Sequence, residues 1–162
     1  GESAEAGPAV VLGSGGAARA AFAFLARGGW SVRVLARSAQ KAEQAASECG
    51  LAADMRPFVA GTGAFSGAAL VINATQLGMN GQQAMPGFVL AELASLAADA
   101  LVFDMVYAPL ETALLAAARA SGHRTADGLE MLIGQAACAF ERFFGQAPLR
   151  AGDAGLRRML TA

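Results

Sequence analysis

The residues best suited to chemistry in this sequence form a glycine-rich turn, Gly13-x-Gly15-x-x-Ala18. Gly13 would permit a tight turn, Gly15 would let a pyrophosphate approach the backbone, and Ala18 would allow a helix to pack closely on a strand. Free N–H groups and the positive end of the helix dipole would face the anion. The turn predicts the start of a dinucleotide-binding βαβ unit, although some glycine-rich turns only join a strand to a helix.

The segments on either side of this turn have the patterns that such a unit needs. Apolar residues 9–12 predict a short buried strand before the turn. After it, apolar residues recur at helical spacing up to Gly28 and Gly29, where the helix would end. These apolar residues are Ala17, Ala20, Ala21, Phe24 and Leu25.

A second polar cluster follows the next predicted strand, residues 31–36. A site that prefers NAD usually carries an acid there to hold the ribose hydroxyls, but the first acid here is Glu43. Arg37 instead offers a planar fork of donors, Lys41 adds a point charge, and Ser38 would cap the following helix. The cluster suits the 2′-phosphate of NADP, and the alternative is a solvated helix start with two exposed cations.

Strands and helices alternate along the rest of the chain, which predicts a doubly wound, Rossmann-like α/β fold. Its sheet would be mostly parallel, with helices on both faces. Further strands are expected at 51–55, 70–73, 100–105 and 123–126, and helices at 38–48, 90–97, 112–120, 129–144 and 152–160. A ligand of such a sheet lies beyond the carboxyl ends of the strands. Gly13, Ala36, Thr75 and Tyr107 all fall there.

Composition narrows the class of protein. The chain has 162 residues, of which 55% are hydrophobic and 15% charged, enough for the core of one domain. We expect that domain to span residues 8–162, after a linker or cloning remnant at 1–7. The net charge of −1, with no basic cluster, argues against nucleic acid as a partner. Without a signal peptide or an apolar run of membrane-spanning length, the cytoplasm is the default location and a membrane is not a partner.

Few other residues could do chemistry. Cys49 and Cys138 are far apart and near no histidine pair, so they suggest neither a disulfide nor a metal site, and Cys138 is expected to be a buried, inert thiol. His123 follows a helix-ending glycine, so we expect a solvated histidine away from the cleft. Asp104 ends a strand and is interpreted as a carboxylate that orients a loop. Tyr107 follows the same strand and could face the cleft, the alternative being a packing role.

Five segments follow one another along the chain: GSGGAAR at 13–19, ARSAQK at 36–41, INATQLGM at 72–79, DMVYAPLET at 104–112 and DGLEMLIGQA at 127–136. Together, and in this order, they resemble the shikimate dehydrogenase family. The first is similar to that family's glycine turn, and the second to its Asn-Arg-Thr followed by a basic residue, except that Ala36 stands where asparagine is common. The third is similar to Asn-Ala-Thr…Gly-Met, the fourth to Asp-x-x-Tyr-x-Pro-x-x-Thr and the fifth to Gly-x-x-Met-Leu-x-x-Gln-Ala.

The resemblance covers the C-terminal, NADP-binding half of that family and implies roles for particular residues. Residues at the pyrophosphate would be Gly13, Ser14, Gly15, Gly16 and Ala17, and those at the 2′-phosphate Arg37, Ser38 and Lys41. Thr75 and Met79 would border the adenine and nicotinamide ends, with Gly128 and Met131 against the nicotinamide. Tyr107 and Gln135 would reach the substrate. For Met131 and Gln135, ordinary core packing is the alternative.

The family's reaction is hydride transfer between NADPH and 3-dehydroshikimate, giving shikimate. Its catalytic lysine and aspartate belong to an N-terminal substrate domain, and nothing in residues 1–162 replaces them. We therefore expect a cofactor domain that reaches its substrate through that other domain, and we leave open a homodimer. Two alternatives remain: a domain of a quinate or aminoshikimate dehydrogenase, and a nucleotide-binding sensor without catalysis.

Overall fold

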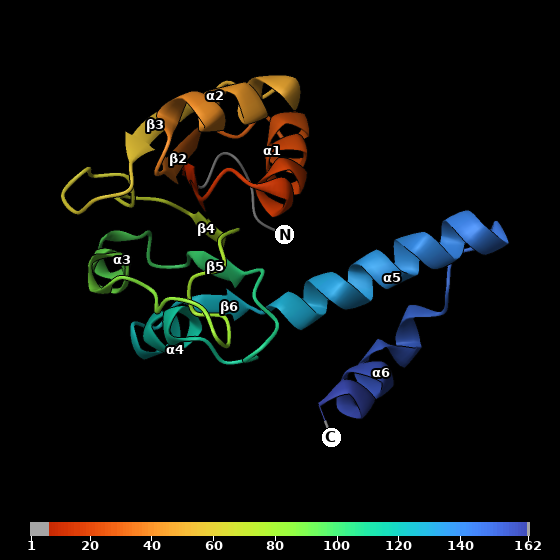
Figure 1. The fold of residues 1–162 in the computed structure, drawn as a ribbon. Coiled ribbons are helices and arrows are strands. Elements are labelled where there is room, and N and C mark those ends of the chain that lie inside the picture. Colours follow the sequence, from red (N-terminus) through yellow and green to blue (C-terminus); the bar gives the residue numbers. More distant parts are fainter. Residues whose placement is uncertain (1–6, 162) are drawn as a thin grey trace.

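Six short strands pair in parallel in the order β3-β2-β1-β4-β5-β6 in the computed structural model, which describes residues 7–161 (Figure 1). The strands are β1 (Ala9–Leu12), β2 (Val32–Ala36), β3 (Asp54–Pro57), β4 (Leu70–Asn73), β5 (Leu101–Asp104) and β6 (Arg124–Ala126). The chain leaves β1 toward one edge of the sheet and later crosses to β4, so the order reverses between these two strands. This arrangement confirms the predicted doubly wound α/β fold.

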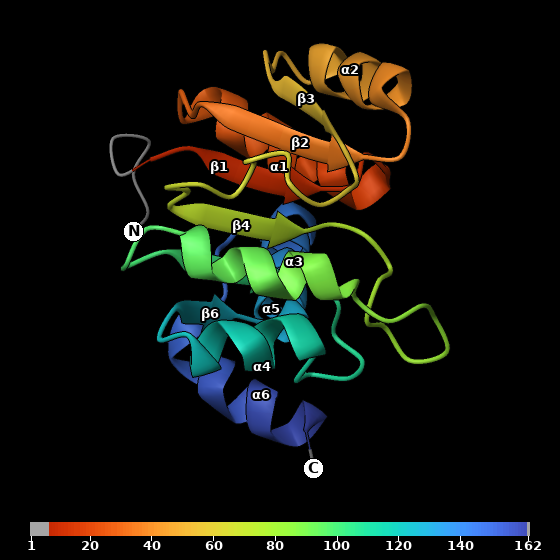
Figure 2. The same cartoon turned by 90° about the vertical axis from the view of Figure 1, so that its left-hand side faces the viewer.

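Helices cover both faces of the sheet, as predicted. They are α1 (Gly16–Arg27), α2 (Ala39–Glu48), α3 (Gly87–Glu92), α4 (Ala113–Ala120), α5 (Gly128–Phe144) and α6 (Asp153–Leu160), with 3-10 turns at Leu93–Ser95 and Arg150–Gly152. One apolar core joins α1 and α2 to the sheet, and a second joins α3 and α4 to its other face. Figure 2 shows α3 and α4 in front of the sheet and α1 behind it.

Alternate residues of β1 serve these two cores, because successive side chains of a strand point to opposite faces. Val11 packs with α1 and α2, whereas Val10 and Leu12 pack with α3 and α4. All three side chains are fully buried. A four-residue strand thus fixes both helical layers, and with them the loops that leave the carboxyl edge of the sheet.

The structure places several predicted elements differently. β3 lies two to three residues later than the expected strand at 51–55, because its register is set by pairing of Arg33 with Asp54 and of Ala36 with Pro57. α3 begins directly after Pro86 rather than at residue 90, since a proline suits a helix start. The core-facing residues of α1 are Ala18, Ala21, Phe22 and Leu25. Phe24 is exposed, as are Ala17 and Ala20.

The helices α5 and α6 project from the body of the sheet, and α6 returns toward the start of α5 (Figure 1). Large apolar side chains on them are exposed, with Phe143 83% and Met159 79% accessible, and Leu149 in the segment between them is 90% accessible. Cys138, expected to be buried, is exposed on α5, because this stretch of the helix has no layer of the described residues packed over it. Of the linker or cloning remnant predicted at 1–7, residues 1–6 lie outside the described residues. None of the helices in residues 7–161 is long and apolar enough to span a membrane.

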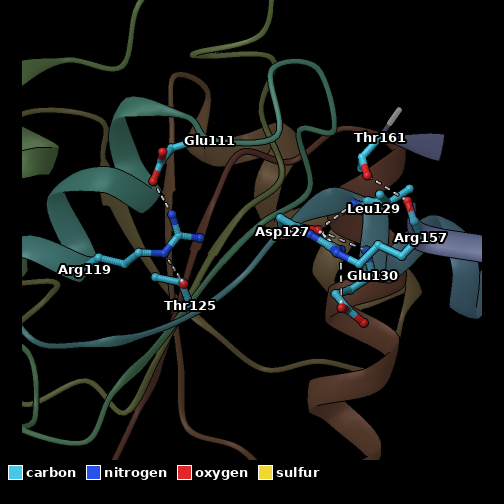
Figure 3. Close-up of polar contacts among 8 residues, drawn as sticks. All are labelled: Glu111, Arg119, Thr125, Asp127, Leu129, Glu130, Arg157 and Thr161. Carbon is cyan, nitrogen blue, oxygen red and sulfur yellow. Dashed lines mark hydrogen bonds and ion pairs between the residues drawn. The ribbon is translucent and has the colours of Figure 1, made fainter. Parts of the chain in front are cut away.

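A buried carboxylate joins the two projecting helices. Asp127 caps α5, accepting hydrogen bonds from the backbone N–H groups of Leu129 (3.1 Å) and Glu130 (3.2 Å). Arg157 of α6 reaches both oxygens of the same carboxylate, and its Nη1 lies 3.0 Å from Oδ1 (Figure 3). The hydrogen bonds from Arg157 and the capped N–H groups hold the pKa of Asp127 below its usual range.

Replacing Arg157 with methionine should loosen α6 and lower the free energy of unfolding by about 1–2 kcal/mol near pH 7, allowing for solvent screening. Because the folded-state pKa of Asp127 is depressed, the stabilisation is present above the unfolded pKa of about 4 and disappears as the pH falls through the folded value. Urea unfolding of both proteins between pH 7 and pH 2 measures this, with Arg158→Met as the control. A stability difference that stays constant to pH 2 would contradict the assignment.

Candidate functional site

The carboxyl ends of the six parallel strands meet at one edge of the sheet, and most of the predicted site residues lie on the loops that leave this edge. The glycine turn follows β1, Arg37 follows β2, and Thr75 follows β4. Tyr107 comes after β5, and Gly128 opens α5 after β6. The predicted grouping at one edge is therefore present, centred on the crossover between β1 and β4.

The glycines of the turn serve two different purposes. Gly13 has a φ of +99°, and a Cβ on it would lie 2.8 Å from Cγ2 of Thr75, so the fold itself requires glycine there. A Cβ on Gly15 or Gly16 would meet nothing within 4 Å. Their small size is therefore not explained by packing inside the protein, and it leaves the start of α1 open to a ligand. Ala18, one turn on, is fully buried against the sheet.

A hollow of about 370 Å³ lies beyond β2 and β3, and β2 is the strand that pairs with β1. It is lined by Ala36, Arg37, Ala39, Met55, Pro57, Phe58 and Val59. The side chains of Arg37 and Lys41 are exposed, and neither forms an ion pair within the described residues. Ser38 caps α2 by accepting a hydrogen bond from the Lys41 N–H at 3.4 Å, as predicted, so its hydroxyl hydrogen can still be donated. An apolar recess lined in part by Arg37, with Lys41 in the first turn of α2, fits an adenosine that carries a phosphate.

Beyond β4 and β5, three fully or almost fully buried polar side chains form a hydrogen-bonded cluster. One oxygen of Asp104 accepts from the amide of Asn73 (2.9 Å) and from the N–H of Val106 (3.0 Å). The other accepts from the hydroxyl of Thr112 at 2.7 Å. Burial raises the pKa of Asp104, and these hydrogen bonds act in the opposite direction. The interpretation of Asp104 as a carboxylate that orients a loop is thus consistent with the structure. The sequence patterns did not indicate that Asn73 and Thr112 would be its hydrogen-bond partners.

The same cluster shapes the loop after β4. The oxygen of the Asn73 amide accepts from the N–H of Thr75 (3.1 Å) and from its hydroxyl (2.6 Å). That hydroxyl in turn accepts from the N–H of Leu77 at 3.1 Å. Farther along, the N–H of Asn80 donates to the carbonyl of Ala108 at 2.9 Å, which joins this loop to the one after β5. Met79 and Tyr107 therefore lie on two loops that are bonded to each other.

The start of α5 packs tightly against the loop after β5. A Cβ on Gly128 would lie 2.5 Å from the carbonyl oxygen of Val106, so only glycine permits this approach. Met131 is half-buried one turn later, and Gln135 is exposed, which excludes the alternative of a core glutamine. Tyr107 is 53% exposed, so its phenol is not a packing residue of the core. Both side chains are available to a ligand.

None of the described residues forms an acid–base pair for proton transfer at this edge. Asp104 has both oxygens engaged inside the protein. His123 lies just before β6, at the opposite edge of the sheet, with its Nε2 3.0 Å from the carbonyl oxygen of Leu93. It is half-buried rather than solvated, because the turn after α4 tucks it against that carbonyl. No group of metal-binding side chains occurs in residues 7–161.

The strand order, the glycine turn at the crossover and the hollow with free cations define a Rossmann-type dinucleotide-binding domain. The comparisons make the class more specific. Residues 128–152 match the family described as the shikimate 5′-dehydrogenase C-terminal domain. The shikimate dehydrogenase (NADP(+)) of Sphingopyxis alaskensis is 46% identical over 159 residues, which are 98% of this chain and 56% of that protein. Nearly the whole chain is thus similar to about half the length of shikimate dehydrogenases (NADP(+)).

Solved structures agree with that similarity. Shikimate 5-dehydrogenase from Thermus thermophilus, in complex with NADP(H) and shikimate, is 35% identical with a TM-score of 0.76, covering 94% of this chain and 55% of that one. Quinate dehydrogenase from Corynebacterium glutamicum, in complex with NAD, is 30% identical with a TM-score of 0.79, covering 91% and 53%. The chain spans about half the length of the curated relatives it matches.

Replacing Gly15 with valine should abolish nucleotide binding without unfolding the domain. The new side chain would enter the open space at the start of α1 and meet no protein atom there. Isothermal titration calorimetry with NADP and NAD, alongside a thermal melt, measures both effects. Gly152→Val is a matched control, because Gly152 directly precedes α6 and a Cβ on it would also face open space. A folded Gly15→Val protein that binds either nucleotide normally would refute the site.

Proposed function

We propose that residues 8–162 form the NADP-binding domain of an enzyme that reduces 3-dehydroshikimate to shikimate. The observation that carries the proposal is Arg37, exposed and unpaired among the described residues, in the lining of the hollow beyond β2 and β3. A site that prefers NAD usually carries a carboxylate there to hold the ribose hydroxyls, whereas a cation suits a 2′-phosphate. The names of the S. alaskensis and T. thermophilus proteins, which mention NADP, support this choice.

The proposed cofactor contacts follow the order of the strands. The pyrophosphate would lie on the open start of α1, held by backbone N–H groups of the glycine turn, and the 2′-phosphate between Arg37, Ser38 and Lys41. Thr75 would border the adenine end, and Met79, Gly128 and Met131 the nicotinamide. The turn consists of Gly13, Ser14, Gly15, Gly16 and Ala17. NADPH supplies the hydride when bound, and these residues orient it.

Substrate would approach from the side of Tyr107 and Gln135, the exposed polar residues beyond β5 and on α5. A phenol and a carboxamide both donate and accept hydrogen bonds, which suits the hydroxyls and carboxylate of shikimate. The proton donor would come from outside residues 1–162, from the substrate domain that the family resemblance implies. The exposed apolar side chains of α5 and α6 fit a surface that the rest of the whole protein, or a second copy, covers.

Quinate is the second candidate substrate. The likeness to the C. glutamicum quinate dehydrogenase, solved with NAD, favours it. Arg37 and the higher identity to shikimate dehydrogenases favour the first candidate.

Replacing Arg37 with glutamate should weaken NADP binding about ten- to hundredfold, because a charge-assisted hydrogen bond is lost and a carboxylate then opposes the phosphate. NAD binding should change far less. Calorimetric titration with each nucleotide gives the ratio of affinities. Arg27→Glu, the same charge change at the far end of α1, is the control and should leave that ratio unaltered. Equal losses for NADP and NAD in Arg37→Glu would contradict the 2′-phosphate site.

The chain alone should bind NADPH but not oxidise shikimate measurably. Hydride transfer at a hydroxyl-bearing carbon requires a positioned proton acceptor, and the described residues offer none at the carboxyl edge. The measurement is the absorbance of NADPH formed from shikimate and NADP, with a full-length family member as the positive control. Substantial turnover by residues 1–162 would show that the acid–base group lies within them.

A further inference from the structure

We propose that Asp104, Asn73 and Thr112 are positioning residues for the nicotinamide half of the dinucleotide. The proposal rests on the proposed function and assigns the buried polar cluster a role beyond stability. The cluster does not contact the ligand itself. It acts through the two loops that carry Met79 and Tyr107.

The geometry makes one carboxylate the common anchor of both loops. Oδ1 of Asp104 holds the N–H of Val106, the residue before Tyr107, and also the amide of Asn73. The Asn73 side chain reaches across the loop after β4, donating to the carbonyl of Leu77 at 3.3 Å and accepting from Thr75. A change at Oδ1 therefore reaches both loops at once.

Thr112 fixes the other end of the loop after β5. Its hydroxyl donates to Oδ2 of Asp104 at 2.7 Å and accepts from the N–H of Leu115 at 3.3 Å, capping α4. The loop after β5 thus begins and ends on the same carboxylate, at Val106 and at Thr112. A Cβ on Gly78, in the loop after β4, would lie 3.8 Å from Cβ of Thr112, so the two loops also pack together there.

The cluster lies on one side of the crossover only. Its strands are β4 and β5, whereas the hollow beside Arg37 is built on β2 and β3, with β1 between the two sets. Within the described part of the chain, no hydrogen bond joins the cluster to Arg37, Ser38 or Lys41. Asn73 also holds Thr75, at the adenine end, but a change confined to Oδ2 of Asp104 leaves the bond between Asn73 and Oδ1 in place. Such a change should therefore affect the loop after β5, at the nicotinamide half of the ligand, and spare the adenosine half.

Asp104→Asn tests this with a minimal change in shape. Its amide oxygen can still accept from Val106 and Asn73, but its NH₂ faces the Thr112 hydroxyl, which then loses its acceptor. Thr112→Ser retains the hydroxyl and is the conservative control. Val102→Ala is a control for loss of stability alone. Val102 lies on β5, as Asp104 does, and it is fully buried but outside the cluster.

Two ligands separate the halves of the site: NADPH, and adenosine 2′,5′-bisphosphate, which lacks the nicotinamide. For Asp104→Asn we expect about a tenfold loss of NADPH affinity, the equivalent of one or two hydrogen bonds, with the affinity for the bisphosphate within about twofold of wild type. The fluorescence of bound NADPH should shift toward that of free NADPH. Thr112→Ser and Val102→Ala should keep the wild-type ratio of affinities.

The outcomes separate this proposal from the proposed function. A wild-type chain that binds neither ligand overturns the proposed function, and this inference with it. If the wild type binds both, an unchanged ratio of affinities in Asp104→Asn overturns the positioning role alone. Should Asp104→Asn fail to fold, Thr112→Val replaces it under the same criteria. If neither variant folds, the cluster is only structural and the proposal is wrong.

Discussion

A carboxylate that is fully removed from water must have its oxygens hydrogen-bonded, because an unpaired buried charge costs several kcal/mol. Asp104 meets this requirement with three donors from three places: the end of β4, the backbone after β5 and the cap of α4. Each donor is thereby fixed relative to the others. The loops at the carboxyl edge of β4 and β5 owe their arrangement to this one group, much as those around β1 owe theirs to the conformation of Gly13.

Under the proposed function, the two halves of the sheet would hold the dinucleotide in different ways. Around β1 and β2, small residues and backbone N–H groups would leave space for phosphates, with charge supplied by exposed cations. Around β4 and β5, buried polar side chains fix the shape of the loops. A phosphate can be held by exposed cations on flexible side chains, whereas a ring that presents one carbon atom for hydride transfer needs a fixed surface.

Local patterns in the sequence were sufficient to predict the alternation of strands and helices, the glycine turn and the cap at Ser38. They could not reveal the cluster, because Asn73 and Asp104 lie 31 residues apart and meet only once β4 and β5 pair. The sequence indicated a loop-orienting role for Asp104 but not the partners of its carboxylate, and Asn73 looked like an ordinary polar residue at the end of a strand. The prediction that Cys138 is buried was wrong for another reason. An apolar helix pattern indicates that a face will be covered, without saying by which part of the chain.

The exposed apolar side chains of α5 and α6 also bear on how this chain behaves in concentrated solution. Its net charge is only −1, so molecules repel one another weakly at neutral pH. Side chains such as Phe143 and Met159 then provide an attraction with little to oppose it. We expect colloidal stability, rather than the stability of the fold, to limit the protein concentration that residues 1–162 tolerate. A buffer farther above the sequence isoelectric point of about 5.8 should relieve that limit, since the added negative charge restores repulsion between molecules.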